Sequence, residues 1–195
     1  MERRAKFERK TSEVEVSVDI NLDGKGNYKI ETGIPFFNHM LSQFAKHGYF
    51  DLSLSAKGDI DVDFHHTVED VGLSLGEAFL KALGDKKGIT RFAEAFVPFD
   101  ESLVFASVDL SGRPYFVYRV RTPKSKIGDF DVELGKEFFK SLSTALKCNL
   151  HIELKYGDNL HHIIEAAFKA VGRALDKASR IDPRSEEVPS TKGKL

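Results

Sequence analysis

The chain has 195 residues, of which 41% are hydrophobic and 30% are charged, with 29 basic residues against 30 acidic ones. A chain of this length can bury a core that folds without disulfides, and its balanced charge excludes a general attraction to nucleic acid or anionic membranes. The single Cys148 cannot form an internal disulfide, and the charged start "MERRAKFERK" lacks the apolar run of a signal peptide. The sequence therefore predicts a globular, cytoplasmic protein that binds any anionic ligand locally.

Periodic patterns predict the elements of the first half in chain order. Residues 17–26, "SVDINLDGKG", are typical of a strand followed by a turn. Residues 32–48, "TGIPFFNHMLSQFAKHG", have apolar positions at helical spacing. Residues 51–59, "DLSLSAKGD", alternate as a half-buried strand does, and a second helix is expected from the double histidine in "DFHHTVED", residues 63–70.

The second half repeats these patterns. "SVDLSGRPYF" at 107–116 echoes the first strand, "DVELGKEFFKSLSTAL" at 131–146 the first helix, and "NLHIELKYGD" at 149–158 the alternating strand. A second double histidine, in "NLHHIIEA" at 159–166, again begins a helix with an apolar face. The order strand, strand, helix, strand, helix is thus predicted twice.

The simplest architecture is an α+β fold, in which two similar halves, each a small β-sheet with two helices, pack about a pseudo-twofold axis. The halves would cover about 1–95 and 96–195 of a single domain, and they would meet near "RFAEAFVPFDES", residues 91–102, where no flexible linker is visible. The C-terminal tail, residues 181–195, has little to fill a core and is expected to be ordered only where it docks.

The repeated pattern HHxxE predicts metal binding. Residues four apart share a helix face, so His65 with Glu69, and His161 with Glu165, can each hold one ion. The adjacent histidines point about 100° away around the helix, which suits two metal centres, or a metal and a substrate. Imidazole and carboxylate without thiolate favour manganese, iron, cobalt or zinc. The competing interpretation is a structural motif copied by duplication.

Two further histidines fit the same site. His151 alternates with apolar neighbours in "NLHIEL" and faces away from the core, and His39 lies in a polar stripe with Gln43 and His47 on the first helix. A solvent-exposed strand or helix face would explain them equally well. The predicted metal ligands are His39, His65, His66, Glu69, His151, His161, His162 and Glu165, enough for two ions with positions left for substrate.

Several cationic and hydroxyl side chains are candidates for binding a phosphate. Lys169 continues the stripe of Glu165 by one helical turn, and Arg113 lies in the turn "SGRPY", where a guanidinium can meet a phosphate. The remaining candidates are Arg91 at an element boundary and Ser190, Thr191 and Lys192 in the tail. Each of these alone is more commonly a solvated polar residue.

With those residues assembled, the chain closely resembles the imidazoleglycerol-phosphate dehydratases of histidine biosynthesis, in the form that is not fused to a phosphatase. The resemblance covers nearly the whole chain and is carried by long, chemically unusual stretches. They are "RKTSEVEV", "TGIPFFNHMLSQFAKHG", "GDIDVDFHHTVED", "GITRF", "VDLSGRP", "LHIELKYGDNLHHIIEAAFKA" and "PSTKGKL".

The resemblance implies a hydro-lyase that converts D-erythro-imidazole-glycerol phosphate to imidazole-acetol phosphate, with two Mn²⁺ held by the eight ligands above. It implies that trimers assemble into a 24-mer whose active sites are shared between subunits. The implied substrate contacts are Glu13, His39, Gln43, His47, His65, Glu69, Arg91, Arg113, His161, Lys169, Ser190 and Lys192. Two departures, Asn38 where the family commonly has Asp, and Phe64 where it commonly has a polar residue, put hydrogen bonding around the ligands in doubt.

The implied chemistry removes a hydrogen that is not next to a carbonyl, so the substrate's own imidazole must accept the electrons. A ring held by metal at both nitrogens, as imidazolate, could expel the hydroxyl and give a diazafulvene-like intermediate. Glu13 is the candidate general base, and Glu165 is its competitor, although a carboxylate that holds a cation is less basic. The alternatives are a two-metal hydrolase and a metal-dependent assembly or storage protein.

Overall fold

The computed structural model describes residues 3–195. The elements of the first half are β1 (Arg4–Lys10), β2 (Val14–Asn21), β3 (Tyr28–Glu31), α1 (Pro35–His47), β4 (Asp51–Gly58) and α2 (His65–Leu83). Those of the second half are β5 (Phe92–Phe99), β6 (Ser102–Asp109), β7 (Tyr115–Arg119), β8 (Lys126–Ile127), β9 (Phe130–Asp131), α3 (Leu134–Leu146), β10 (Asn149–Tyr156) and α4 (Leu160–Ser179).

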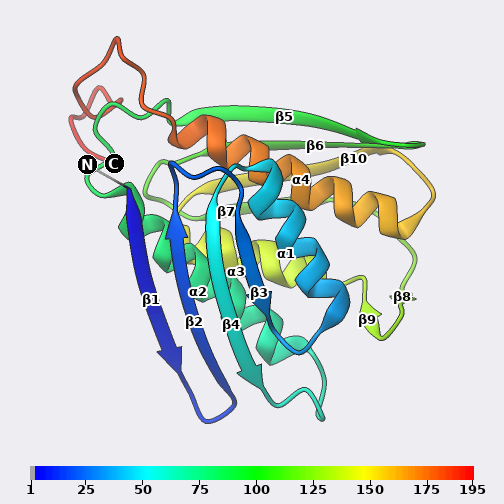
Figure 1. Ribbon diagram of the computed structural model, residues 1–195. Helices are drawn as coiled ribbons and strands as arrows, with labels where there is room; N and C mark the ends of the chain where they lie inside the picture. The colour runs from blue at the N-terminus through cyan, green and yellow to red at the C-terminus, as the bar shows by residue number, and fades with distance from the viewer. Residues whose placement is uncertain (1–2) are drawn as a thin grey trace.

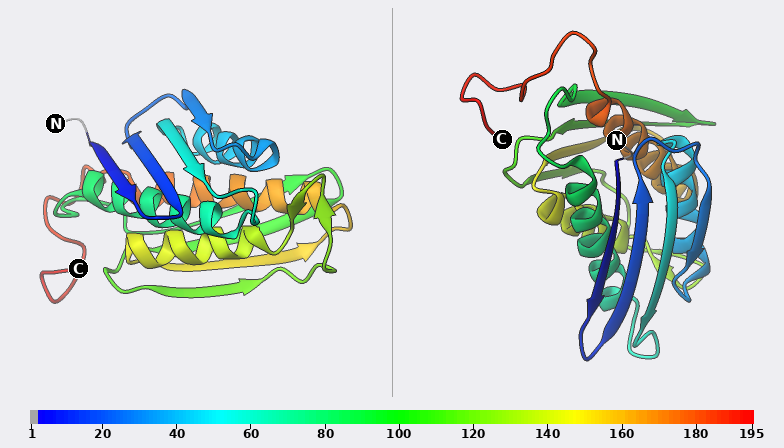
Figure 2. Two further views of the ribbon diagram at one scale, coloured as in Figure 1. Left: turned by 90° about the horizontal axis from the view of Figure 1, so that it is seen from below. Right: turned by 60° about the vertical axis from the view of Figure 1, so that its left-hand side comes forward.

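Two four-stranded sheets form the outer layers, in the orders β1-β2-β4-β3 and β5-β6-β10-β7. The edge strand β3 is parallel to its neighbour β4, and the edge strand β7 is parallel to its neighbour β10. All other strand pairs in the two sheets are antiparallel. The helices lie between the sheets, with α1 and α2 on the first and α3 and α4 on the second (Figures 1 and 2). The predicted α+β class with two similar halves is confirmed.

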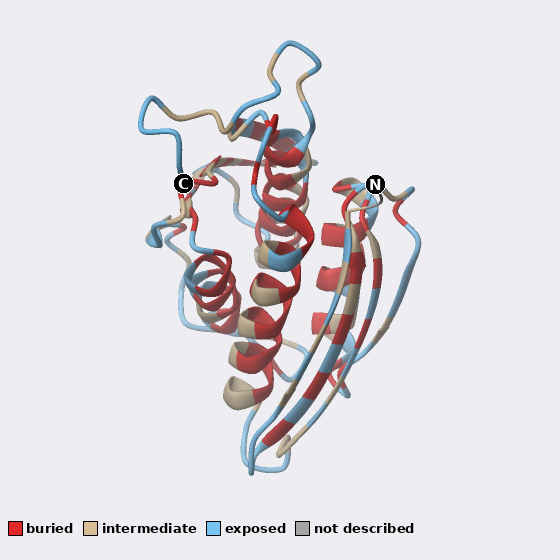
Figure 3. Cartoon of the chain, turned by 90° about the vertical axis from the view of Figure 1, so that its left-hand side faces the viewer, coloured by how far each residue is buried: buried red, intermediate tan, exposed pale blue. Residues whose placement is uncertain are grey.

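The contacts between helices have the symmetry that two related halves require. Helix α1 packs on α4, and α2 packs on α3. Exchanging the halves turns the first of these pairs into the second. A hydrophobic core runs through both pairs, and Figure 3 shows the buried residues concentrated on the helices and alternating with exposed ones along the strands. One core therefore serves both halves.

The first half has three strands before its first helix, and the second half has five, counting the two-residue strands β8 and β9, so the predicted order with two strands is wrong. No strand was predicted at β1 or β5, and β3 and β7 were missed because both are short and their residues do not alternate between buried and exposed. Such strands lie at a sheet edge, where pairing with one neighbour replaces burial as the cause of the extended backbone. By contrast β2, which was predicted, alternates buried Val14, Val16, Val18 and Ile20 with outward polar residues.

The strand register corrects the alignment of the two halves. β2 pairs Ile20 with Leu52 of β4, and β6 pairs Val108 with Leu150 of β10. Since Leu52 and Leu150 are both the second residue of their strands, Ile20 is the counterpart of Val108. The predicted echo matched Val18 with Val108 and is wrong by two residues. A shift of two keeps every side chain on its face, so the alternation could not reveal the error.

Equivalent glycines let the helices approach closely. A Cβ built on Gly172 of α4 would lie 2.6 Å from the Phe44 carbonyl oxygen of α1. One built on Gly76 of α2 would lie 2.7 Å from the Leu142 carbonyl oxygen of α3. Both distances are too short for a carbon atom, so these helix pairs require glycine at their crossing points.

The tail docks on its own chain. The Asp182 amide donates to the Gly88 carbonyl oxygen at 2.7 Å, and the Gly88 amide donates to the Glu187 carbonyl oxygen at 2.9 Å. The residues after α4 therefore lie against the loop that precedes β5. Strand β5 begins at Phe92, within the segment where the halves were expected to meet. Within residues 3–195, no helix has the length and apolar character to cross a bilayer.

Candidate functional site

Both double histidines lie in the first turn of a long helix, and a polar side chain just before each helix fixes that turn. The Asp63 carboxylate accepts a hydrogen bond from the His65 amide at 2.8 Å, and the Asn159 side chain accepts one from the His161 amide at 2.9 Å. Side-chain acceptors at these positions satisfy amides that the helix itself leaves unpaired. The imidazoles therefore project from a well-defined helix start in both halves.

Helices α1 and α4 together form a compact cluster of side chains that could hold a metal ion. Nε2 of His39 lies 2.9 Å from Oε2 of Glu165, and Nε2 of His161 lies 3.1 Å from the same oxygen. The ligand atoms of these three residues all lie within 4.8 Å of one another, and no other group of three or more His, Cys, Asp or Glu residues within residues 3–195 does so. Two imidazole nitrogens converging on one carboxylate oxygen are donors suited to a borderline divalent cation.

Lys169 contacts the same carboxylate from the opposite side. Its Nζ lies 2.6 Å from Oε1 of Glu165 and 4.0 Å from the centroid of the Phe99 ring. Burial alone would raise the pKa of Glu165, but hydrogen bonds from Lys169, His39 and His161 outweigh it and lower that pKa below its usual value. Glu165 is therefore held as a carboxylate, as a metal ligand must be.

In the polar stripe of α1, His39 contacts Glu165 of α4, although the His39 side chain is itself exposed. Gln43 and His47 are only partly exposed. Desolvation, together with the positive charges of Lys169 and Arg173, lowers the pKa of His47. His47 therefore lies close to the positive charges of Lys169 and Arg173 on α4.

The first double histidine lies in a different environment. Nδ1 of His66 donates to Oδ2 of Asp59 at 3.0 Å, and Oε2 of Glu13 lies 3.8 Å from the same nitrogen. The Asp59 hydrogen bond is the main cause of a raised pKa of His66. Unlike His161 and Glu165, His65 and Glu69 make no hydrogen bond or ion pair with each other in the described chain. His65 instead borders a pocket next to the start of α3.

The second histidine of α4 also has a carboxylate on Nδ1. His162 Nδ1 donates to Oε2 of Glu101 at 2.7 Å, and the centroid of the His162 ring lies 4.6 Å from that of Phe99, with the rings tilted by 50°. The other oxygen of Glu101 accepts hydrogen bonds from the Ser102 hydroxyl and the Asn159 amide. These three donors, with His162 the strongest, hold the pKa of Glu101 well below its usual range.

His151 is apart from both clusters. It is exposed on the outer face of β10, where its ring lies 6.3 Å from that of Tyr115. The sheet separates this face from the helices that carry the other candidate ligands. Within one chain, His151 therefore does not join the cluster of His39, His161 and Glu165.

The anion-binding candidates other than Lys169 converge, whereas Lys169 lies against Glu165. Arg91 and Arg113 line one pocket with tail residues Pro189, Ser190, Thr191, Lys192, Lys194 and Leu195. Arg91 is held in place by Asp109, which accepts from its Nε at 2.8 Å, and by the Pro189 carbonyl, which accepts from Nη1 at 2.8 Å. Arg113 is exposed. Cations, a hydroxyl and backbone amides around one hollow can bind a phosphate.

This tail pocket and the α1–α4 cluster lie at opposite ends of α4. His161 is the second residue of this 20-residue helix, and the tail begins after its last residue, Ser179. A helix of that length spans about 30 Å at 1.5 Å per residue. Figure 1 shows the tail and the start of α4 on opposite sides of the molecule. A small substrate therefore cannot contact both sites within one chain.

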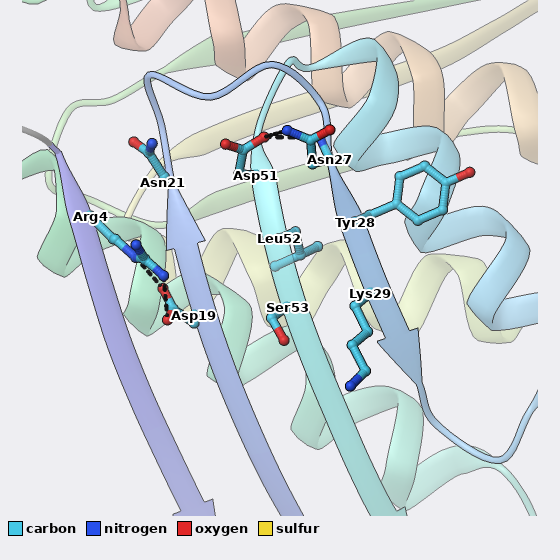
Figure 4. Close-up of a pocket in the computed structure, with 9 residues that line it drawn as sticks. All are labelled: Arg4, Asp19, Asn21, Asn27, Tyr28, Lys29, Asp51, Leu52 and Ser53. Carbon is cyan, nitrogen blue, oxygen red and sulfur yellow. Dashed lines mark hydrogen bonds and ion pairs between the residues drawn. The ribbon is translucent and has the colours of Figure 1, made fainter.

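A different hollow lies on the outer face of the first sheet. Its nine lining residues, drawn in Figure 4, are Arg4, Asp19, Asn21, Asn27, Tyr28, Lys29, Asp51, Leu52 and Ser53. Arg4 pairs there with Asp19, and Asp51 accepts from Asn27. These bonds hold the sheet and the turn before β3, and no predicted site residue is in this set.

Several residues of the site were not predicted. Asp59, Glu101 and Phe99 contact histidines of the two motifs, and Asp109 orients Arg91. Glu101 became recognisable as the counterpart of Glu13 only with the corrected strand register. The other three depend on contacts between distant segments.

The two departures from the family pattern have clear structural settings. The Asn38 side-chain oxygen accepts from the Thr32 amide at 2.9 Å and from its hydroxyl at 2.6 Å, so the hydrogen bonding there is satisfied. Phe64 packs against the hydrophobic core. Neither residue contacts a metal-ligand candidate through a polar atom.

Comparison with known proteins agrees with this geometry. Residues 32–175 match the family model described as imidazoleglycerol-phosphate dehydratase. Imidazoleglycerol-phosphate dehydratase of Pelobacter propionicus is 60% identical over 195 residues, covering 100% of both chains. That of Thermoanaerobacter pseudethanolicus is 57% identical over 193 residues, covering 99% of this chain and 100% of that protein.

Two solved structures have the same fold. The Staphylococcus aureus imidazoleglycerol-phosphate dehydratase superposes with a TM-score of 0.83 at 37% identity, covering 92% of this chain and 99% of that one. The Pyrococcus furiosus enzyme, solved in complex with (S)-C348, superposes with a TM-score of 0.81 at 37% identity, covering 96% and 99%.

Proposed function

Because the chain belongs to the imidazoleglycerol-phosphate dehydratase family, the hydro-lyases of histidine biosynthesis, we propose that it dehydrates D-erythro-imidazole-glycerol phosphate to imidazole-acetol phosphate in a metal-dependent reaction. The observation that carries the metal dependence is the convergence of His39, His161 and Glu165 on one point. A cation there would replace the protons that these groups now share. The single free Cys148 is buried, which suits the reducing cytoplasm we propose as its location.

We propose that the cofactor is a pair of Mn²⁺ ions. One would be held around His39, His161 and Glu165, and the other around the first double histidine and Glu69. His66 and His162 support this, because each has Nδ1 hydrogen-bonded to a carboxylate and leaves Nε2 for a ligand bond. When bound, the ions would act as Lewis acids on both nitrogens of the substrate ring and stabilise it as an imidazolate, the electron sink the reaction needs.

The chain's own residues would divide the remaining tasks. The tail pocket with Arg91, Arg113, Ser190 and Lys192 would bind the phosphate and hold the substrate's carbon chain in register. Glu13 would remove the carbon-bound proton. Its side chain is 55% exposed, and its Oε2 lies 3.8 Å from His66 Nδ1, so its lone pairs are accessible to substrate.

Glu165 is the weaker candidate for the base. Its carboxylate already accepts from two histidines and Lys169, and its pKa is lowered. A carboxylate stabilised in its charged form has less tendency to take a proton. Glu165 therefore suits the metal, and Glu13 suits the proton.

A complete site would require a homo-oligomer. In one chain the tail pocket is about 30 Å from the start of α4, and His151 lies on the outer face of the second sheet. That face also exposes large aromatic side chains, namely Phe92, Phe96 and Tyr115, which are 57%, 55% and 64% exposed. Exposed aromatic groups on a sheet face are typical of a protein interface.

The outer face of the first sheet is different. It carries charged and polar residues such as Arg4, Asp19 and Lys29 (Figure 4). We therefore propose that the second sheet is buried between subunits, that His151 completes a metal site of a neighbouring chain, and that trimers built in this way assemble to a 24-mer.

The test supplies imidazole glycerol phosphate to protein that has been stripped of metal and reloaded with Mn²⁺. Formation of the ketone product, lost on chelation and restored by Mn²⁺, is the expected result. Release of free phosphate would indicate a two-metal hydrolase instead. Metal-dependent assembly without turnover of either kind would indicate a structural or storage role.

A further inference from the structure

Glu13 and Glu101 occupy equivalent positions in the two halves. Each is the residue before the second strand of its half, Val14 of β2 and Ser102 of β6. The corrected register, with Ile20 equivalent to Val108, gives the same match. The fold thus delivers one carboxylate to the turn beside each double histidine.

In the second half this carboxylate is fully engaged. Oε2 of Glu101 accepts from His162 Nδ1 at 2.7 Å, while Oε1 accepts from the Ser102 hydroxyl at 2.7 Å and from the Asn159 amide at 3.0 Å. Glu101 therefore joins the strand turn, the start of α4 and the imidazole. With its Nδ1 proton fixed there, the His162 ring can present only Nε2 to a ligand.

In the first half another residue has this task. The loop before α2 runs over residues 59–64, whereas the loop before α4 covers only 157–159. The longer loop brings Asp59 to 3.0 Å from His66 Nδ1, with Glu13 behind it at 3.8 Å. Asp158 is the counterpart of Asp59 in the second half, since it follows Gly157 as Asp59 follows Gly58, and its side chain is exposed.

We infer that the two halves use equivalent carboxylates differently: Glu101 is a positioning residue that orients His162 as a ligand, whereas Asp59 orients His66 and so leaves Glu13 free to act on the substrate. The inference rests on the proposed metal site. It assigns to Asp59 and Glu101 a role that neither sequence motif indicated.

The test removes each carboxylate in turn, by Glu101→Ala, Asp59→Ala, Glu13→Ala and Asp158→Ala. Mn²⁺ affinity of the assembled, metal-stripped protein is measured by isothermal titration calorimetry, with thermal unfolding as a check on folding. Loss of a group that orients a metal-binding histidine typically lowers metal affinity about 10- to 100-fold. We expect that loss in the Glu101 and Asp59 variants, and unchanged affinity in the Glu13 and Asp158 variants.

Glu101→Gln is a gentler second variant. Glutamine has one acceptor oxygen, so it can serve His162 or the Ser102 and Asn159 donors, but not both sides as Glu101 does. It should weaken Mn²⁺ binding while preserving most of the fold.

The outcomes separate the two hypotheses. An unmodified protein that neither binds Mn²⁺ nor dehydrates the substrate would refute the proposed function and this inference with it. An active protein whose Glu101 variants bind Mn²⁺ normally, or whose Glu13 variant loses affinity as Glu101→Ala does, would refute only the division of roles.

Discussion

Replacing Gly172 by alanine should disturb the contact that brings His39 to Glu165. The new Cβ would lie 2.6 Å from the Phe44 carbonyl oxygen, a backbone atom that cannot rotate away. Overpacking of this kind costs about 1–3 kcal/mol. The better helix propensity of alanine returns about 1 kcal/mol. A net destabilisation of up to about 2 kcal/mol is therefore expected, with α1 displaced from α4.

Gly135→Ala in α3 is the matched control. Its Cβ would lie 3.7 Å and 3.9 Å from two carbons of Ile164, which is ordinary van der Waals contact. At this position alanine causes no overpacking and only raises the helix propensity, so this variant should be slightly more stable than the parent. Gly76→Ala, at the equivalent crossing of α2 and α3, should behave as Gly172→Ala does.

Thermal unfolding followed by circular dichroism, at one protein concentration, measures these differences. For a chain of this size about 1 kcal/mol shifts the Tm by roughly 2–4 °C. Gly172→Ala should melt lower than the parent, and its Mn²⁺ affinity should fall because His39 moves away from Glu165. A Gly172→Ala protein as stable as Gly135→Ala would refute the argument that the crossing requires glycine.

Four further predictions concern single side chains. Glu13→Gln should abolish dehydration while metal content and assembly stay normal; normal turnover would reject Glu13 as the base. Arg113→Met and Lys192→Met should raise KM for the phosphorylated substrate much more than they lower kcat, since both line the tail pocket, and a steady-state assay that finds only kcat changed would contradict a phosphate-binding role. Burial raises the pKa of Cys148 to about 12, so the native thiol should stay unreactive toward a thiol reagent at pH 8 and react after unfolding; rapid native labelling would argue against the buried position. Hydrogen bonds from two backbone amides lower the pKa of Asp51 from 3.8 in the folded protein. The Asp51 carboxylate therefore stabilises the folded protein above pH 3.8, and this stabilisation is lost as the pH falls through the lowered pKa. Asp51→Asn should therefore melt below the parent at pH 7, and the gap should narrow toward pH 3; a gap independent of pH would oppose this explanation.

The sequence by itself determined the repeated architecture and the chemistry of the ligands. Apolar spacing located the helices and the strands β2, β4 and β10, because burial of one face imposes a period of 3.6 or 2 residues on the chain. The HHxxE motifs indicated metal ligands because residues four apart on a helix share a face. These signals are local, so they can be read without knowing which segments meet.

The tertiary structure decided what depends on distant segments meeting. The short edge strands β3 and β7 carry no alternation, and they exist because a neighbouring strand pairs with them. The strand register moved the alignment of the halves by two residues, which no period-2 pattern can detect. His39 meets Glu165 across 126 positions of sequence, His162 meets Glu101 across 61, and Arg91 meets Pro189 across 98. Such contacts are products of packing, and this is why the sequence named the candidate metal ligands but not the carboxylates that hydrogen-bond to His66 and His162.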